Sequence, residues 1–107
     1  MGKPIPIYVG VCTAFKVNLE KADFSSVDKY ILTIKNKADV SAPVIIEREF
    51  TTAEITPVTI KPEESVLLTD GAIYDFNKIL KADGSRHAVP GSLGAVVLIK
   101  GAGGCIG

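Results

Sequence analysis

The chain has 107 residues, and its 12 basic side chains balance its 12 acidic ones, so the formal net charge is zero with the single histidine neutral. A chain of this length makes one domain, residues 1–107, that can bury a hydrophobic core of its own. The charge balance argues against a general affinity for nucleic acid, and no apolar run approaches the roughly 20 residues that cross a bilayer. We therefore expect neither nucleic acid nor membrane insertion.

The first segment with a strand pattern is also interrupted by prolines. Ile5, Ile7 and Val9 alternate along one face, while Pro4 and Pro6 lie between them. Proline cannot donate a hydrogen bond to a sheet, so the pattern predicts an edge strand or a lead-in to one. The same segment lacks the sustained apolar stretch of a secretory signal.

The middle of the chain carries further segments in which apolar and polar residues alternate, as in half-buried strands. They lie at 15–19, 30–35, 44–50 and 55–60. Within the second of them, Tyr30, Leu32 and Ile34 share the face that we expect to turn toward the core. Pro57 interrupts the last segment and indicates another edge strand.

A single helical turn is predicted at 61–65, because Pro62 suits a first helical position and two acidic residues follow it. A long strand at 72–82 then places Tyr74, Phe76 and Leu80 on one face. Asp83-Gly84 predicts a hairpin with a type I′ turn, in which both central residues have a positive φ.

The last predicted strand, 94–100, is apolar throughout and is expected to be buried, with Val97 and Ile99 facing the core. The glycine-rich segment 101–107 is expected to be a flexible tail. The whole pattern predicts an all-β fold. We expect a single immunoglobulin-like β-sandwich of about seven or eight antiparallel strands with one short helical turn, and a small barrel is the alternative.

Candidate chemistry is sparse. Cys12 and Cys105 are the two cysteines; we expect reduced thiols, as in the cytosol, with a disulfide as the alternative. His87 sits on the return strand of the predicted hairpin and reads as a surface histidine rather than a general base. Glu47 and Glu49 read as a solvated strand face. The sequence shows no nucleophile elbow, phosphate loop or metal-ligand spacing, so we expect no catalytic residues, no metal and no cofactor.

The run from Ile55 to Gly101 resembles small β-sandwich domains of tailed-phage and prophage virion proteins. The matching pieces are Thr59, Glu63–Leu68, Gly71–Phe76, Asp83–Arg86 and Gly91–Val97, and the strands at 15–17 and 30–35 resemble the opening strands of those domains. The resemblance implies a sandwich fold and a place in a virion, in the tail, the baseplate or the head accessories. It supplies no catalytic residues.

From these observations we expect a non-enzymatic structural or attachment module of a phage or prophage particle. It would act through protein–protein contacts with other virion proteins and as a homo-oligomer, in the bacterial cytoplasm during assembly and then in the virion. The expected interface comprises the proline-interrupted edges, at Ile5, Ile7, Val9 and Pro57. The alternative is a module that binds carbohydrate or a host surface; the absence of tryptophan makes it the second choice.

Overall fold

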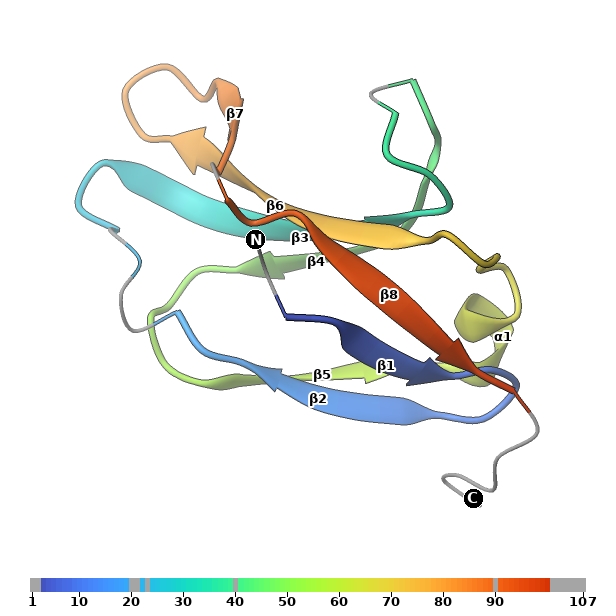
Figure 1. Ribbon diagram of the computed structural model, residues 1–107. Helices are drawn as coiled ribbons and strands as arrows, with labels where there is room; N and C mark the ends of the chain where they lie inside the picture. The colour runs from blue at the N-terminus through green and yellow to red at the C-terminus, as the bar shows by residue number, and fades with distance from the viewer. Residues whose placement is uncertain (1–2, 20–21, 23, 40, 90, 101–107) are drawn as a thin grey trace.

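The computed structural model describes residues 3–19, 22, 24–39, 41–89 and 91–100. Over these residues the chain forms strands and one helical turn, as predicted (Figure 1). The elements are β1 (Ile5–Tyr8), β2 (Thr13–Val17), β3 (Val27–Lys35), β4 (Val44–Phe50), β5 (Thr56–Ile60), α1 (Pro62–Ser65), β6 (Ile73–Leu80), β7 (Arg86–Ala88) and β8 (Gly94–Ile99).

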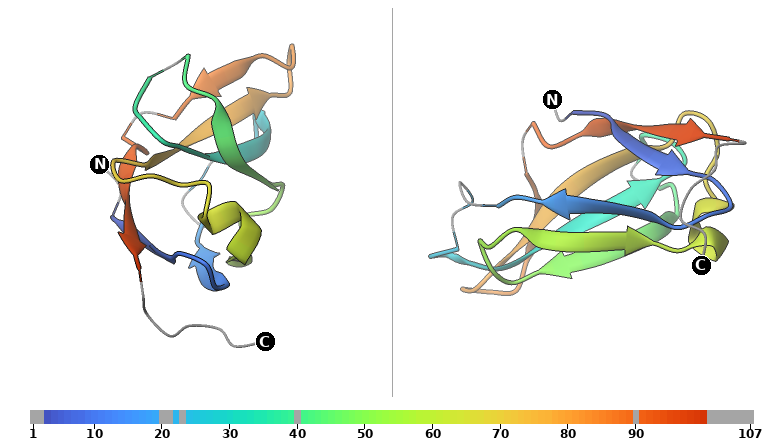
Figure 2. Two further views of the ribbon diagram at one scale, coloured as in Figure 1. Left: turned by 90° about the vertical axis from the view of Figure 1, so that its right-hand side faces the viewer. Right: turned by 90° about the horizontal axis from the view of Figure 1, so that it is seen from below.

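The strands make two facing sheets. The larger has the order β1-β8-β6-β3-β4, with β7 also paired to β6, and the smaller consists of β2 and β5. Figure 2 shows the two layers from the side and from below. Strands β2 and β5 face β8, β6, β3 and β4, so the chain forms a sandwich of the predicted immunoglobulin-like kind.

One pairing departs from the antiparallel rule. Strand β8 pairs with β6 only at its beginning, and it then runs parallel to β1, in register from Ile5 opposite Val96 to Tyr8 opposite Ile99. Parallel neighbours need a long connection between them, and almost the whole chain connects β1 to β8. In Figure 1, β8 therefore passes diagonally from the upper sheet toward β1.

The core lies between the sheets and follows the predicted alternation. Leu32 and Ile34 of β3 are fully buried, and Tyr74 of β6 is 5% exposed. The smaller sheet contributes Val17, Val58 and Ile60 to the same cluster. Burial of such side chains is the main stabilising contribution to a sandwich of this size.

The inward face of β8 differs from the prediction by one residue. Val96 is 7% exposed whereas Val97 is 46% exposed, so the expected inward position of Val97 is wrong. Gly94 determines which face of β8 turns to the core, because it lies against Tyr74. A Cβ at Gly94 would come within 2.4 Å of the tyrosine ring. Because Gly94 must face inward, Val96 and Leu98 face inward too, and the strand is half-buried rather than fully buried.

The hairpin between β6 and β7 forms, but its turn is not type I′. Gly84 has a φ of 70°, and no other kind of residue among those described has a positive φ, so Asp83 cannot occupy a type I′ position. The loop is longer than a two-residue type I′ turn. The amide of Gly84 bonds to the carbonyl of Leu80, and the amide of Leu80 bonds to the carbonyl of Ser85.

Cys12 is disulfide-bonded, so the expectation of a reduced thiol there is wrong. Cys105 and the predicted flexible tail at 101–107 lie outside the described residues. Cys12 follows the turn that joins β1 to β2.

Candidate functional site

The sandwich has two seams, where an edge strand of the larger sheet lies beside an edge strand of the smaller one. The first seam joins β4 to β5, and the second joins β1 to β2. We call them the closed seam and the open seam, because among the described residues the side chain of Arg48 bonds across the first, whereas the second is bridged at the end where β1 leads into β2.

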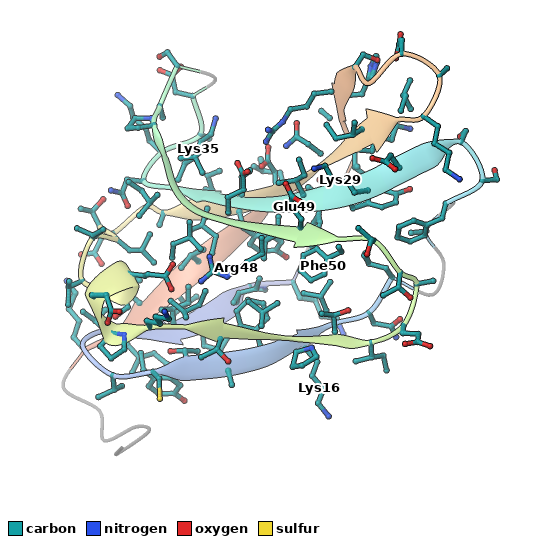
Figure 3. All side chains as sticks on the ribbon, turned by 180° about the vertical axis from the view of Figure 1, so that it is seen from behind. Lys16, Lys29, Lys35, Arg48, Glu49 and Phe50 are labelled. Atoms are coloured by element: carbon teal, nitrogen blue, oxygen red, sulfur yellow. The ribbon has the colours of Figure 1, made fainter. Side chains whose placement is uncertain are left out.

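Arg48 closes the first seam. Its Nη2 donates to the two carboxylate oxygens of Glu64 at 2.7 and 2.9 Å and to the carbonyl of Thr59 at 3.2 Å. Its Nη1 donates to the carbonyl of Glu47 at 2.9 Å. Figure 3 shows Arg48 on the same side of β4 as Phe50, between the layers, whereas Glu49 points outward beside Lys29. The arginine therefore links β4, β5 and α1.

Glu64 is held in its charged form at this seam. Burial raises the pKa of its carboxyl group, but the Arg48 hydrogen bond, the Lys61 amide and the charges of both residues outweigh that effect, so the pKa lies below its ordinary value. The Lys61 amide donates to Glu64 at 3.0 Å, as in a capped helix start.

At the open seam, β1 presents an edge without free main-chain donors. The amide of Val9 bonds to the carbonyl of Ile99 in β8. Successive main-chain N–H groups point to opposite sides of a strand, so the amides of Ile5 and Ile7 also point to β8. The nitrogens of Pro6 and Tyr8 therefore point to the seam. Pro6 has no N–H, and the Tyr8 amide donates to the Thr13 hydroxyl oxygen at 2.8 Å.

Strand β2, on the other side of the open seam, does present donors. Lys16 pairs with Pro57 in the antiparallel ladder, and a proline can only occupy a pair that exchanges no hydrogen bonds. The main-chain groups of Lys16 and Ala14 thus point away from β5, toward the open seam. A second observation agrees. The carbonyl of Thr59, which lies opposite Ala14, accepts a hydrogen bond from Arg48, so Thr59 points its main-chain groups away from β2 and this pair too exchanges no ladder bonds.

A groove of about 460 Å³ occupies the open seam. Its walls are Ile5 and Pro6 on one side and Phe15 and Leu19 on the other; its floor is Tyr74 and Phe76, which meet edge to face with ring centroids 6.4 Å apart. The Tyr74 hydroxyl donates to the carbonyl of Lys3 at 2.5 Å, and burial raises the pKa of the phenol, so it remains a donor. Of the residues that the structure describes, the charged ones that line this groove are Lys3 and Lys16.

The predicted interface residues divide between the core and the surface. Ile7 is fully buried inside the sandwich, so its side chain contacts this chain's own core. Ile5 and Val9 are half-buried, and Ile5 packs against the core from the groove side. Pro57 is exposed on β5, with its nitrogen toward the closed seam. The involvement of these residues in an interface stays a prediction.

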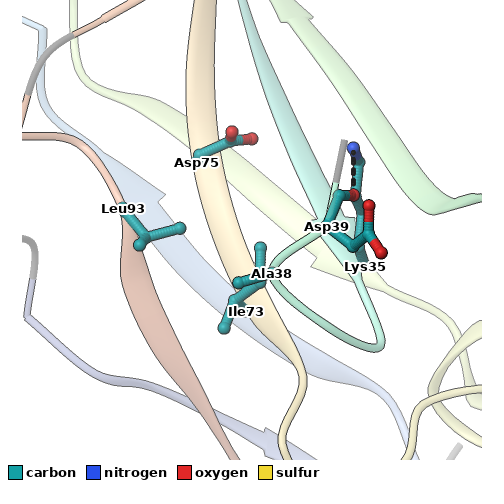
Figure 4. Close-up of a pocket in the computed structure, with 6 residues that line it drawn as sticks. All are labelled: Lys35, Ala38, Asp39, Ile73, Asp75 and Leu93. Atoms are coloured by element: carbon teal, nitrogen blue, oxygen red, sulfur yellow. Dashed lines mark hydrogen bonds between the residues drawn. The ribbon is translucent and has the colours of Figure 1, made fainter. Parts of the chain in front are cut away.

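The outer face of the larger sheet carries a second depression, between the β3–β4 loop and the β6–β7 hairpin, which both rise above the sheet in Figure 1. Two adjoining pockets of about 210 and 390 Å³ share Lys35 and Asp75. Figure 4 shows the smaller one, where Lys35 donates to the carbonyl of Asp39. Asp75 accepts a hydrogen bond from the buried Thr33 hydroxyl, so its carboxylate is already engaged.

The histidine lies in a hydrogen-bonded chain on the β6–β7 hairpin that does not have the geometry of a catalytic triad. Ser85 donates its hydroxyl to Asp83 at 2.6 Å, and His87 Nε2 lies 2.8 Å from the same hydroxyl. Since the serine proton goes to the carboxylate, the imidazole acts as donor and cannot take that proton, whereas a triad needs the carboxylate behind the histidine. The serine bonds also lower the pKa of Asp83.

Among the residues described, no three metal-ligating side chains gather in one place. Nor is any helix in that part of the chain long and apolar enough to cross a membrane. No protein-family model matches this chain, and no curated protein matches it at a significant level. The fold and the open seam therefore carry the functional argument.

Proposed function

We propose that this protein is a non-enzymatic structural or attachment module of a phage or prophage particle, and that it docks on a neighbouring virion protein through the open seam. The resemblance of residues 55–101 to virion sandwich domains supports the setting. The observation that carries the docking site is the asymmetry of the two seams: three hydrogen bonds from Arg48 link β4 to β5 and α1 at one, and the other holds an apolar groove.

The groove has the features of a protein-binding surface rather than of a catalytic pocket. Its floor is aromatic, and aromatic residues are enriched at the centres of interfaces. The titratable groups that line it are Lys3, Lys16 and Tyr74, and the Tyr74 hydroxyl is engaged by the carbonyl of Lys3. Among the described residues of the groove, none is a nucleophile with an adjacent base, and the proposed role of the groove is therefore contact area and not acid–base chemistry.

The disulfide at Cys12 agrees with a particle that leaves the cell. Disulfides persist in oxidising surroundings and are rare in the cytosol. A virion component assembles in the cytoplasm and then experiences the oxidising exterior, where such a bond can form and remain.

The proposal is tested by finding the chain in particles. Cells that carry the gene are induced to release particles, which are banded by density, and the chain is detected in the band by mass spectrometry. We expect the parent and a Val66→Glu control to be incorporated, because Val66 is 57% exposed on the turn after α1. We expect Ile5→Glu, in the groove wall, to fold but to be missing from particles. Absence of the parent from every banded particle would overturn the proposal.

The alternative, recognition of a carbohydrate or host surface, is favoured by the outer-face depression. Thr33, Asp75, Asn77 and Arg86 line it, and such hydroxyl, amide and charged groups can bond to sugar hydroxyls. No aromatic side chain lines either pocket there, so it lacks the stacking surface that would bind a sugar face. Binding of the parent to a glycan array, lost in Asn77→Ala, would favour this second function.

A further inference from the structure

We propose that the occupant of the open seam is an extended strand of a different protein, which adds to the edge of β2 and carries an acidic residue. This inference rests on the proposed docking function and specifies its chemistry. Three observations lead to it: the main-chain donors on β2, the blocked edge of β1 and the charge of the groove.

The main-chain groups of Ala14 and Lys16 point into the seam, and their amides have no partner in the part of the chain that the structure describes. Both residues are exposed. A partner strand satisfies these amides in full, because strand addition supplies an acceptor and a donor at every second residue. The edge is already held straight by the ladder from Thr13 to Val17, so little order is lost on binding.

The other edges are less suited to this role. On β1, Pro6 and the engaged Tyr8 amide leave no free donor facing the seam. On β5, the nitrogen of Pro57 faces outward and Arg48 occupies the carbonyl of Thr59. On β4, the same arginine occupies the carbonyl of Glu47. Proline and inward-pointing charges at edges are known devices against unwanted pairing, and among the four strands at the two seams they leave β2 as the edge that accepts a strand.

The charge of the groove selects the partner. Lys3 and Lys16 line it, and none of the described residues that line it is acidic, so an acidic side chain in the incoming strand gains a favourable interaction. A second copy pairing β2 with β2 about a two-fold axis would instead bring the two Lys16 side chains close together, and opposed like charges destabilise a strand pair. The partner is therefore a segment of another protein, with an apolar residue over Tyr74 and Phe76.

The test uses a yeast-displayed library of random linear heptapeptides, selected on the intact protein. Lys16→Pro removes the seam amide but no ladder bond, because that amide does not bond to β5. Thr59→Pro is the matched control. Like Lys16, Thr59 belongs to a pair that exchanges no ladder bonds, but its amide points to the closed seam on the other side of the β2–β5 sheet. Lys16→Ala removes the charge and keeps the amide. Circular dichroism and thermal melting establish that each variant is folded.

We expect enriched peptides that alternate apolar with acidic residues, that bind Lys16→Pro at least ten-fold more weakly than the parent, and that bind Thr59→Pro like the parent. Lys16→Ala should lose affinity by a smaller factor. Amide hydrogen exchange gives a readout that does not depend on the proline variants. In the free parent the Phe15 amide should be protected and those of Ala14 and Lys16 should exchange fast, and peptide binding should slow these two at least ten-fold.

Failure to enrich any peptide, equal binding to Lys16→Pro, or unchanged exchange at Ala14 and Lys16 would each overturn strand addition. Dimerisation of the parent that Lys16→Pro abolishes would show that the occupant is a second copy, and it would also overturn the proposal. The docking function is judged separately: if strand addition fails while Ile5→Glu is still excluded from particles, the groove binds its partner by side-chain contacts alone.

Discussion

Arg48→Met is the sharpest test of the closed seam, because methionine keeps an apolar stem of similar reach and removes every hydrogen bond. The parent arginine bonds to two main-chain carbonyls and to Glu64. Hydrogen bonds to charged groups contribute about 1.5–3 kcal/mol when buried, and exposed ion pairs contribute about 0.2–1 kcal/mol. These side chains are 30% and 24% exposed, so we expect Arg48→Met to lower the free energy of unfolding by about 2 kcal/mol.

The dependence on pH gives the same prediction a second, independent measurement. The pKa of Glu64 in the folded chain lies below its ordinary value of 4.5. A carboxylate with a lowered pKa stabilises the fold above its ordinary value, and that contribution is lost as the pH falls through the folded pKa. The difference between the parent and Arg48→Met should therefore be full at pH 7 and should shrink between pH 4.5 and pH 3.

The assay is urea unfolding followed by circular dichroism at pH 7 and at pH 3, for Arg48→Met, Glu64→Gln and the double variant. We expect a coupling energy of about 1 kcal/mol between the two positions at pH 7, and a smaller one at pH 3. Lys29→Met is the control, since the Lys29–Glu49 pair lies on the outer face with side chains 29% and 50% exposed, and it should change stability by less than about 0.5 kcal/mol. A coupling below about 0.3 kcal/mol at pH 7 would refute the argument that Arg48 holds the seam.

Four further predictions concern the core, β8 and Cys12. Leu32→Ala removes a fully buried side chain and should cost about 2–5 kcal/mol in urea unfolding; a loss under about 1 kcal/mol would mean that the site is not core. Val96→Lys should prevent stable folding while Val97→Lys melts like the parent, because only Val96 faces inward; the reverse result would restore the opposite phase of β8. Gly94→Ala should cost about 1–3 kcal/mol, since the new Cβ overlaps the Tyr74 ring, and Tyr74→Ala in the same background should relieve part of that loss. Cys12→Ser should lower stability by about 2–4 kcal/mol without reductant, and adding reductant to the parent should have the same effect; identical melting of parent and variant would exclude a stabilising bond.

Much of the fold could be predicted because its strands alternate in the printed sequence. Val44, Ile46 and Phe50 share one parity, and β4 has the predicted bounds. That parity also includes Arg48, so the sequence held a signal that this arginine faces inward, between two glutamates that face outward. Only the two glutamates were predicted to form a solvated face, and no facing was predicted for Arg48, because its partner is not visible in the sequence; that partner, Glu64, comes from the turn after β5.

The face of β8 that turns to the core could not be predicted in the same way. Its residues from Ala95 to Ile99 are all apolar, so no polar residue marks the outer face, and the register depends on Gly94 meeting Tyr74. The prolines were more informative. They identified β1 and β5 as edges. A proline within a ladder must point its nitrogen away from the paired strand, and this also fixes which neighbouring amides point toward that strand. What they could not show was which edge lies beside which.

The open seam is compatible with a stable sandwich because its opening is local. At one end the Tyr8 amide is held by Thr13, and the Gly10 amide is held by the fully buried Ser65 at 2.9 Å. These bonds anchor the turn between β1 and β2 to the remainder of the fold, so the strands remain in place where the groove begins. Farther along, Pro6 removes the main-chain donor with which β1 could have bonded to β2, and Lys16 keeps the donor on the facing edge. Pro6 therefore withholds a main-chain donor from the seam while each sheet keeps its own ladder, and the edge of β2 lies beside an aromatic floor. We expect an ordered edge of this kind to lose little conformational entropy when a partner adds to it, which supports the proposal that this seam, and not the one that Arg48 closes, is the docking site.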